Sequence, residues 1–436
     1  MEYKVTKLPK SEIEICVTLP SLEFEPYIKK AATLISEEIE IEGFRKGKAP
    51  YDVVKQRVGE SAIYEKAADL AIKESHRKLM ERVFREGLLA GVLTPVGRPE
   101  VTVTKLAPGN DLCYKVKFAV LPQVKLPDYK IITKRLLKER KKVSVSDADV
   151  VRAIDWVRES RAPLVTVERP ARNGDRLEID FEVRHNGVRI EGGESRNHPL
   201  VLGKGKFLPG FEQALMGMQR DEEKNFTTKV TEDWYEKNLV GKTLDIKISV
   251  KLVQELQLPD LTDDFAKSIG NFSTLDALKT SVREGIIQEK EDKERERLRV
   301  LIIEEIAKEA EIEIPNILIE AELDKILEEF KSGIGGMGMK WEDYLIHIKK
   351  TMEGLRGDWR QEAEGRVRIA LCLREIARVN NIDPGEEEIK ARADRFLAQF
   401  KSADKAGGEI DAESLREYTK GVLRNEKVFE FLESIN

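Results

Sequence analysis

The sequence predicts an α+β protein of several domains, and three observations indicate this. Its 436 residues suggest about three domains at roughly 150 residues each. Alternating apolar residues, typical of β-strands, occur in two separate parts of the chain. From Leu261 onward, apolar residues follow the period of an α-helix almost throughout. We therefore expect an α/β domain over residues 1–120, a linker over 121–168, an antiparallel sheet wrapped on one helix over 169–256 and an all-helical domain over 257–436.

In the first region, alternation at Ile13, Ile15 and Val17 predicts a strand, and a helix is expected from Ser21 to about Glu42. The stretch Gly43–Pro50 interrupts it because two glycines and a proline cannot continue a helix. Further along, the pattern predicts a helix over about 51–86 with an interruption at Gly59, then strands around 101–103 and 114–118.

The linker is basic between Lys134 and Lys142. A solvated extended strand is favoured over a nucleic-acid surface there, because no aromatic residues interleave to stack on bases. Ser146 and Asp149 resemble a capping box, which predicts that a short helix begins at this point.

The third region has β character, with alternation over 177–183 and 244–250. Asn173-Gly174 and Asn186-Gly187 predict tight turns, since both residue types tolerate a positive φ. A short helical stretch follows Gly203–Phe211, which completes a small antiparallel sheet around one helix.

The helical region begins with a highly charged helix over 275–309, and Ile314-Pro315 ends that pattern. The next helix carries an apolar stripe from Ile319 to Phe330. Gly333–Met339 is expected to be a mobile tip between two helices, where Met337 and Met339 adapt to varied apolar surfaces and so bind client chains.

Composition excludes several classes of protein. Lys and Arg number 75 against 80 Asp and Glu, a net charge of −5, so the chain is not a basic protein that coats nucleic acid. No apolar run approaches the length of a membrane span and the amino terminus lacks a signal-peptide pattern, so we expect a cytoplasmic protein with no membrane partner. The three cysteines are far apart, which argues against a disulfide framework or a zinc ribbon.

No constellation of residues indicates covalent or metal-dependent catalysis. The four histidines have no metal-ligand spacing. Gly333–Gly338 fits GxGxxG literally but follows a helix, whereas a dinucleotide fingerprint follows a strand. We expect neither a metal nor a cofactor.

The loop Gly43–Pro50 carries the most specific signal. Phe44 lies beside Arg45, Lys46 and Lys48 at a helix-free tip, which suits docking to a surface with phosphates and an apolar protein pocket. This stretch resembles GFRxGKxP, the ribosome-docking signature of the trigger factor family of chaperones. The resemblance implies that Gly43, Phe44, Arg45, Lys46, Gly47, Lys48 and Pro50 bind the ribosome.

Other motifs extend the resemblance over nearly the whole chain. Asn173–Arg176, Glu191–Gly193, Leu208–Glu212 and Asn238–Lys242 resemble the FKBP-type prolyl isomerase domain of that family. Leu261–Ala266 and Ile314-Pro315 resemble landmarks of its helical carboxyl-terminal domain.

The resemblance implies a chaperone that docks near the ribosomal exit tunnel and holds nascent and unfolded polypeptides in a cradle of helices, on whose body the 121–168 linker packs. It implies no sequence-specific nucleic acid, and it leaves open whether the free protein forms a homodimer. Prolyl isomerisation is also expected, since an apolar pocket desolvates the amide and favours its twisted state.

Matched residue by residue, the family's catalytic pocket falls on Phe181, Ile190, Glu191, Leu208, Phe211, Trp234 and Ile246. Ile190 and Ile246 stand where the family commonly has phenylalanine, Trp234 where tyrosine is usual, and His198 also replaces a phenylalanine. These departures predict weak activity. Three alternatives remain: an isomerase domain that only binds peptide, a stand-alone prolyl isomerase, and a helical adaptor or scaffold.

Overall fold

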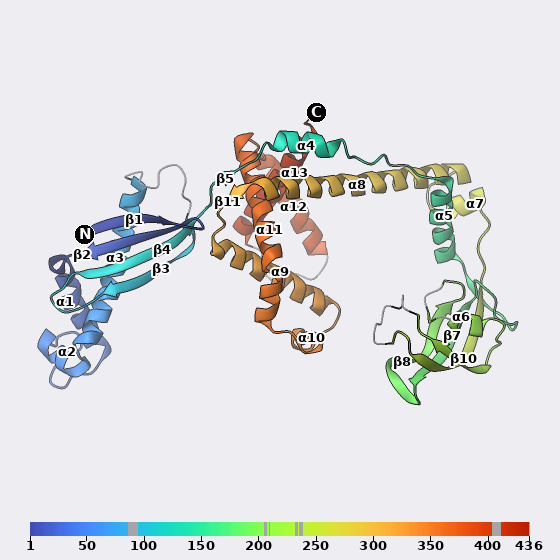
Figure 1. Cartoon of the computed structure of the whole chain (residues 1–436), viewed down its shortest axis with the longest axis horizontal. Coiled ribbons are helices and arrows are strands. Elements are labelled where there is room, and N and C mark those ends of the chain that lie inside the picture. Colours follow the sequence, from blue (N-terminus) through green and yellow to red (C-terminus); the bar gives the residue numbers. More distant parts are fainter. Residues whose placement is uncertain are drawn as a thin grey trace. The chain divides into compact units, whose positions relative to one another are not determined.

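The computed structural model describes residues 1–85, 95–204, 207–208, 210–231, 234, 239–402 and 411–435. The chain divides into two compact units, one formed by residues 1–140 with 296–436 and the other by residues 141–295. Figure 1 labels most of the helices and strands of both. Within the described ranges, no helix combines the length and the apolarity that crossing a membrane requires.

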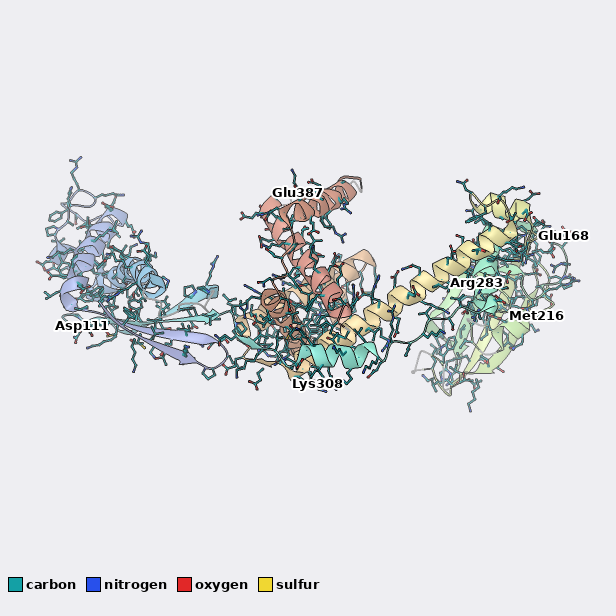
Figure 2. All side chains as sticks on the ribbon, turned by 90° about the horizontal axis from the view of Figure 1, so that it is seen from above. Asp111, Glu168, Met216, Arg283, Lys308 and Glu387 are labelled. Carbon is teal, nitrogen blue, oxygen red and sulfur yellow. The ribbon has the colours of Figure 1, made fainter. Side chains whose placement is uncertain are left out.

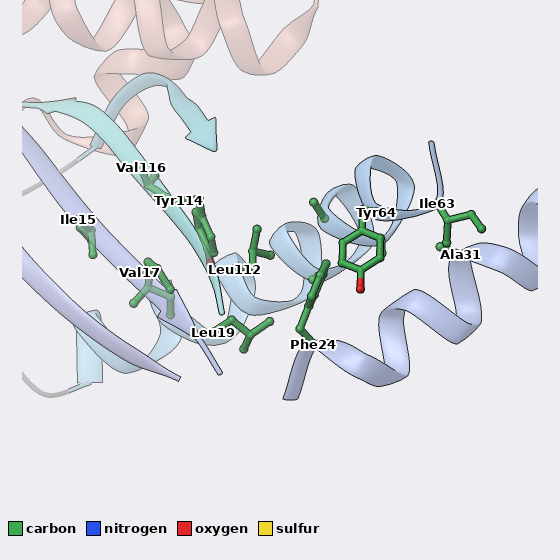
Figure 3. Close-up of a cluster of buried hydrophobic side chains, with 14 of the residues drawn as sticks. Ile15, Val17, Leu19, Phe24, Ala31, Ile63, Tyr64, Leu112, Tyr114 and Val116 are labelled. Atoms are coloured by element: carbon green, nitrogen blue, oxygen red, sulfur yellow. The ribbon is translucent and has the colours of Figure 1, made fainter. Parts of the chain in front are cut away.

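The amino-terminal part of the first unit is an antiparallel sheet in the order β1-β2-β4-β3. Its strands are β1 (Glu2–Leu8), β2 (Glu12–Leu19), β3 (Pro95–Lys105) and β4 (Leu112–Val120), and its helices are α1 (Ser21–Glu38), α2 (Tyr51–Val58) and α3 (Glu60–Arg85). One face of β2 and β4 is buried against these helices, and Figure 3 shows Phe24 and Tyr64 beside the strand residues. The sheet and the helices therefore share one hydrophobic core, and the loop between α1 and α2 is anchored to this core through its two flanking helices.

Two details of this region differ from the sequence prediction. Strand β1 was not expected, although it pairs with β2 over its whole length. Helix α1 ends at Glu38 rather than near Glu42, since Ile39 has an extended backbone. Four acidic residues between 37 and 42 and no basic residue in the last turn disfavour further helix at the negative end of the helix dipole.

The rest of the first unit is a helical body. Strands β5 (Val124–Lys125) and β11 (Glu311–Ile312) pair at its edge, and its helices are α4 (Tyr129–Leu137), α9 (Asn316–Gly336), α10 (Trp341–Ile348), α11 (Met352–Val379), α12 (Glu386–Ser402) and α13 (Ala412–Glu433). The carboxyl-terminal part of α8 (Leu275–Glu309) completes the core, where Ile302, Ile306, Cys372 and Val428 are buried together. Figure 2 shows side chains along α8, with Arg283 and Lys308 labelled toward its two ends.

The structure corrects two predictions about this body. The first part of the basic linker stretch is helical rather than extended, because Asp128 caps helix α4 by accepting a hydrogen bond from the Ile131 N–H at 3.2 Å, and regular helix ends at Leu137. Tyr129, Ile132 and Leu136 form its buried face. The glycine-rich tip is also shorter than expected, since α9 continues through Gly336 and only Met337 and the residues after it leave the helix.

The second unit begins with α5 (Asp147–Arg161), and its capping box between Ser146 and Asp149 is confirmed by reciprocal hydrogen bonds. Helix α5 packs against α7 (Asp263–Ile269) and the start of α8 through Val150, Ile154 and Phe265. Segments on both sides of the intervening sheet thus share one small core.

That sheet contains β6 (Leu164–Thr166), β7 (Arg176–His185), β8 (Val188–Val201), β9 (Glu223–Lys229) and β10 (Thr243–Leu256), with the short helix α6 (Phe211–Leu215) against it. Its order is β6-β10-β7-β8, and β9 also pairs with β10. The β7–β8 turn has positive φ at Asn186 (51°) and Gly187 (80°), which confirms the predicted tight turn.

The first and last strands of this sheet pair with each other. Leu164 lies opposite Leu256 in the β6–β10 ladder, and the Gln257 N–H donates to the Pro163 carbonyl at 3.1 Å. The polypeptide therefore enters and leaves the sheet at facing positions.

Candidate functional site

The loop between α1 and α2 is held by a few backbone hydrogen bonds. The Gly47 N–H donates to the Ser36 carbonyl at the end of α1 (3.0 Å), and the Lys48 N–H donates to the Arg45 carbonyl (2.9 Å). Gly43 and Gly47 have φ of +85° and +75°, the left-handed region that favours glycine. The loop thus has a defined conformation that depends on its glycines.

Gly47 also has no room for a side chain in its present surroundings. A Cβ added there would lie 2.8 Å from the Cγ of Glu37. Phe44 has 44% of its surface exposed, and Arg45, Lys46 and Lys48 are exposed as well. Pro50 has an extended backbone at the start of α2. An aromatic ring and three cations are therefore presented to solvent from a short, tethered loop.

A hollow of about 880 Å³ lies beside this loop. Ile41 and Val53 are its partly buried apolar residues, and Phe44, Arg45 and Lys46 line it from the loop side. Its remaining lining residues are Glu40, Glu42, Gln56 and Arg57. Sequence reasoning missed the contribution of α2, since helical spacing alone does not reveal which face of α2 meets the loop.

The second candidate site is an aromatic cluster inside the 164–256 sheet. Phe181 of β7 makes edge-to-face contacts with Phe211 of α6 (5.8 Å between ring centroids) and with His198 of β8 (5.5 Å). Phe207 stacks on Phe211 at 4.6 Å and also contacts Phe181 and His198. Four rings from separate segments therefore form one continuous aromatic surface.

The other pocket residues expected from the sequence lie around this surface with different exposure. Ile190, Leu208 and Trp234 are partly buried and pack against the same core. Phe211 and Ile246 are almost fully covered, with 1% and 2% of their surfaces exposed. The Glu191 side chain and residues Pro209 and Asn238 lie outside the described part of the structure.

Two aromatic residues of this region were not expected in the pocket. Phe207 is one, and the other is Phe226 of β9, which contacts Phe211 at 6.1 Å and pairs with Ile246 across the β9–β10 ladder. Phe207 could have been predicted as a pocket residue because it precedes Leu208 in the sequence. The neighbour of Phe226, by contrast, depends on the register of strand β9. The cluster consequently keeps more aromatic surface than the substitutions at Ile190 and Ile246 suggested.

The absence of a side chain at Gly193 leaves room for the Ile190 side chain. A Cβ at Gly193 would lie 2.4 Å from the Ile190 Cγ1 and 2.9 Å from the Val183 carbonyl oxygen. The glycine thus lets Ile190 fold back over the β7–β8 pairing beside the aromatic cluster.

The third candidate site is the end of α9 together with α10. Met337 and Met339 have 81% and 46% of their surfaces exposed, and α10 buries none of its residues. Phe330, Trp341, Tyr344 and Trp359 form an aromatic cluster here, with centroid distances of 5.1–6.0 Å. Sequence reasoning identified the methionines but missed these aromatic neighbours.

Comparison with known families assigns most of the chain. Residues 1–157 match the family described as "Bacterial trigger factor protein (TF)", and residues 274–434 match the description of its C-terminus. Residues 167–258 match the family "FKBP-type peptidyl-prolyl cis-trans isomerase".

Individual relatives agree over nearly the full length. The chain is 32% identical to the trigger factor of Caldicellulosiruptor bescii over 98% of this chain and 95% of the relative. It is 31% identical to that of Halalkalibacterium halodurans over 99% and 98%. A solved structure described as "Promiscuous Substrate Recognition in Folding and Assembly Activities of the Trigger Factor Chaperone" is similar over 100% of both chains, with a TM-score of 0.53 and 23% identity, and so supports the fold.

Proposed function

Because this chain belongs to the trigger factor family of chaperones, we propose that it docks near the ribosomal exit tunnel through the loop Gly43–Pro50. In this proposal residues 1–120 bind the ribosome, 121–168 link the domains, 169–256 isomerise prolyl bonds and 257–436 hold nascent and unfolded polypeptides. The protein then works in the cytoplasm, where translating ribosomes are found.

The exposed loop is the observation that carries the docking proposal. Phe44 offers an apolar anchor, and Arg45, Lys46 and Lys48 offer cations for phosphate or carboxylate groups. The bond from Gly47 to the end of α1 limits the freedom of the loop, so less conformational entropy is lost when it binds.

Cosedimentation with ribosomes tests this proposal. A Phe44→Ala/Arg45→Ala/Lys46→Ala variant is expected to stay folded and to lose ribosome binding. Binding by the wild type should weaken as the salt concentration rises, because its cations release counterions from phosphates. A matched control changes Val101, Arg98 and Lys105 to alanine, since these are also one exposed apolar and two exposed cationic residues of the same domain. Equal cosedimentation of the loop variant and the control would contradict docking through this loop.

For the isomerase domain we propose that the pocket residues act as an apolar surface around a substrate proline. Phe181, Ile190, Leu208 and Trp234 would contact it from the sides, while Phe211 and Ile246 would support the floor. Rotation about the X–Pro bond faces a barrier of about 18–20 kcal/mol because the amide has partial double-bond character. Removing water from the amide favours the twisted state without any acid, base or nucleophile.

The same geometry favours a second candidate, an isomerase domain that only binds extended peptide. Phe207 stacks on Phe211, so this ring already covers part of the surface that a proline would use. A proline-peptide assay separates the two candidates. Wild-type activity equal to the uncatalysed rate would leave binding as the function of this domain.

For client binding we propose Met337 and Met339 as contact residues. Flexible thioether side chains fit apolar segments of different shape, and the exposed helix α10 with its aromatic cluster continues the same apolar surface.

A further inference from the structure

Helix α4 carries a cationic surface that the proposed docking loop does not include. Residues 128–142 contain seven Lys or Arg and two acidic residues, a net charge of +5 in a chain whose total is −5. On α4 and just after it, Lys130, Lys134, Arg135, Lys138 and Arg140 are all exposed.

These cations differ from most others on the body in having few partners. Arg135 bonds Glu305 of α8 at 3.0 Å. Considering only the part of the chain that the structure describes, Lys130, Lys134, Lys138 and Arg140 have no carboxylate within 4.0 Å. By contrast, several lysines elsewhere on the body are paired, for example Lys325 with Glu322 and Lys427 with Glu388.

The arrangement is unfavourable for the helix itself. Lys130, Lys134 and Lys138 are spaced four residues apart, so like charges lie one turn from each other. Lys134 and Lys138 benefit from the negative end of the helix dipole, but Lys130 lies in the first turn, where the dipole disfavours a cation. An anion bound along this row would remove both penalties.

The kind of anion follows from what α4 lacks. Most of its apolar side chains are already used, since Tyr129, Ile132 and Leu136 are buried in the body. Ile131 alone is largely exposed (65%), and one isolated apolar residue is no face that could enter a lipid surface. Apart from buried Tyr129, residues 128–142 contain no aromatic residue that could stack on unpaired bases. A row of cations without stacking residues suits the phosphate backbone of a double helix, which in RNA is recognised by shape and phosphates.

We propose that α4 and the residues after it form a second, sequence-independent surface for the phosphate backbone of double-helical RNA. This inference rests on the proposed ribosome docking, because a ribosome presents such RNA. It also revises the sequence-based interpretation of this stretch, since the helix aligns cations that an extended chain would scatter.

The test measures binding of the full-length protein to a labelled RNA hairpin of about 20 base pairs by fluorescence anisotropy, with two unrelated sequences and between about 50 and 200 mM KCl. The variant is Lys130→Gln/Lys134→Gln/Lys138→Gln. The matched control Lys325→Gln/Lys420→Gln/Lys427→Gln removes the same charge from paired lysines of the same unit. The α4 variant is expected to bind at least about tenfold more weakly, to both sequences alike, and to lower the salt slope by about 2–3.

Equal affinities of the α4 variant and its control, or no duplex binding by the wild type at about 50 mM KCl, would overturn the inference. So would wild-type binding to polyglutamate or to phosphatidylglycerol vesicles but not to the duplex. Ribosome cosedimentation of the wild type is measured in parallel. If it holds while duplex binding is unaffected by the α4 changes, only this inference fails; if it is absent, the docking proposal fails.

Discussion

Gly47→Ala should weaken ribosome binding although it changes none of the residues proposed to contact the ribosome. Gly47 has φ of +75°, and its N–H makes the bond that tethers the loop to the end of α1. Alanine disfavours this backbone conformation, so part of the population should leave it. The proposed contacts of Phe44, Arg45 and Lys46 would then be preorganised in fewer molecules.

The magnitude follows from two terms. An L side chain in the left-handed region costs roughly 1–2 kcal/mol. The added Cβ would also lie 2.8 Å from the Glu37 Cγ, but Glu37 is exposed and can turn away at little cost. Because the apparent affinity scales with the fraction in the competent conformation, we expect binding weaker by up to about 5–30-fold.

Ribosome cosedimentation over a range of protein concentrations measures this change. Gly109→Ala is the matched control, since Gly109 has φ of +72° in the same domain with nothing within 4 Å of an added Cβ. Its strain is similar, yet its affinity should stay within about twofold of wild type. Adding Glu37→Ala to Gly47→Ala should restore little, because the backbone term remains.

An affinity equal to that of the wild type in the Gly47→Ala variant would refute the reasoning. Ribosome binding would then not depend on the left-handed backbone conformation of residue 47. Equal weakening by Gly109→Ala would refute it as well, because the effect would then belong to the stability of the domain.

Four further predictions concern the isomerase domain and the body. Phe211→Ala should remove most of kcat/KM on a proline peptide and lower the Tm of the domain, because truncating a fully packed aromatic costs about 3–5 kcal/mol. Ile190→Phe should raise kcat/KM several-fold by adding flat apolar surface beside the ring cluster. A variant without residues 169–256 should still suppress aggregation of a denatured protein, as followed by light scattering. Asp175→Asn should lower stability at pH 7 by about 1.5–3 kcal/mol; burial alone would raise the pKa of Asp175, but hydrogen bonds from Arg169 hold it below its usual value. The wild-type carboxylate therefore stabilises the fold above about pH 4 and loses this effect as the pH falls through the lowered pKa, so thermal melting at pH 7 and pH 3 should differ less in the variant.

Controls for these experiments come from the same domains. Asp245 is exposed and, among the described residues, makes no ion pair within 4.0 Å, although Arg184 lies opposite it on β7. Asp245→Asn should therefore change stability by less than about 0.5 kcal/mol. A folded 169–256 deletion variant that loses all suppression would show that the client surface lies elsewhere. An unchanged rate for Phe211→Ala in correctly folded protein would exclude the proposed pocket floor.

Features set by local sequence were predictable. The capping box at Ser146 and the tight turn at Asn186-Gly187 depend on residues within a few positions of each other, and both occur as expected. The loop Gly43–Pro50 was recognised because its glycines and proline exclude helix, and α1 indeed ends before it and α2 begins directly after it.

Features set by distant partners were not predictable. Helix α4 was missed because the cations of residues 130–142 obscured the apolar spacing of Tyr129, Ile132 and Leu136, whose burial depends on the distant helices of the body. Phe226 joins the aromatic cluster only through the register of β9 on β10, and no short-range signal specifies that register. The sequence likewise could not show that Ile246 lies almost fully covered.

The pairing of Leu164 with Leu256 has a consequence for how such a protein arises and can be rearranged. Since the Pro163 carbonyl accepts the Gln257 N–H, the two ends of the intervening segment are neighbours across one ladder. Excising that segment from the gene would leave two termini that a tight turn could rejoin. In the reverse operation, the module would be inserted into a surface turn of another protein. The two host residues that flank the insertion would need to be only as far apart as neighbouring strands of a sheet. A single recombination event could therefore add or remove the module with little change to the backbone around it. The module is accordingly suited to insertion into other proteins.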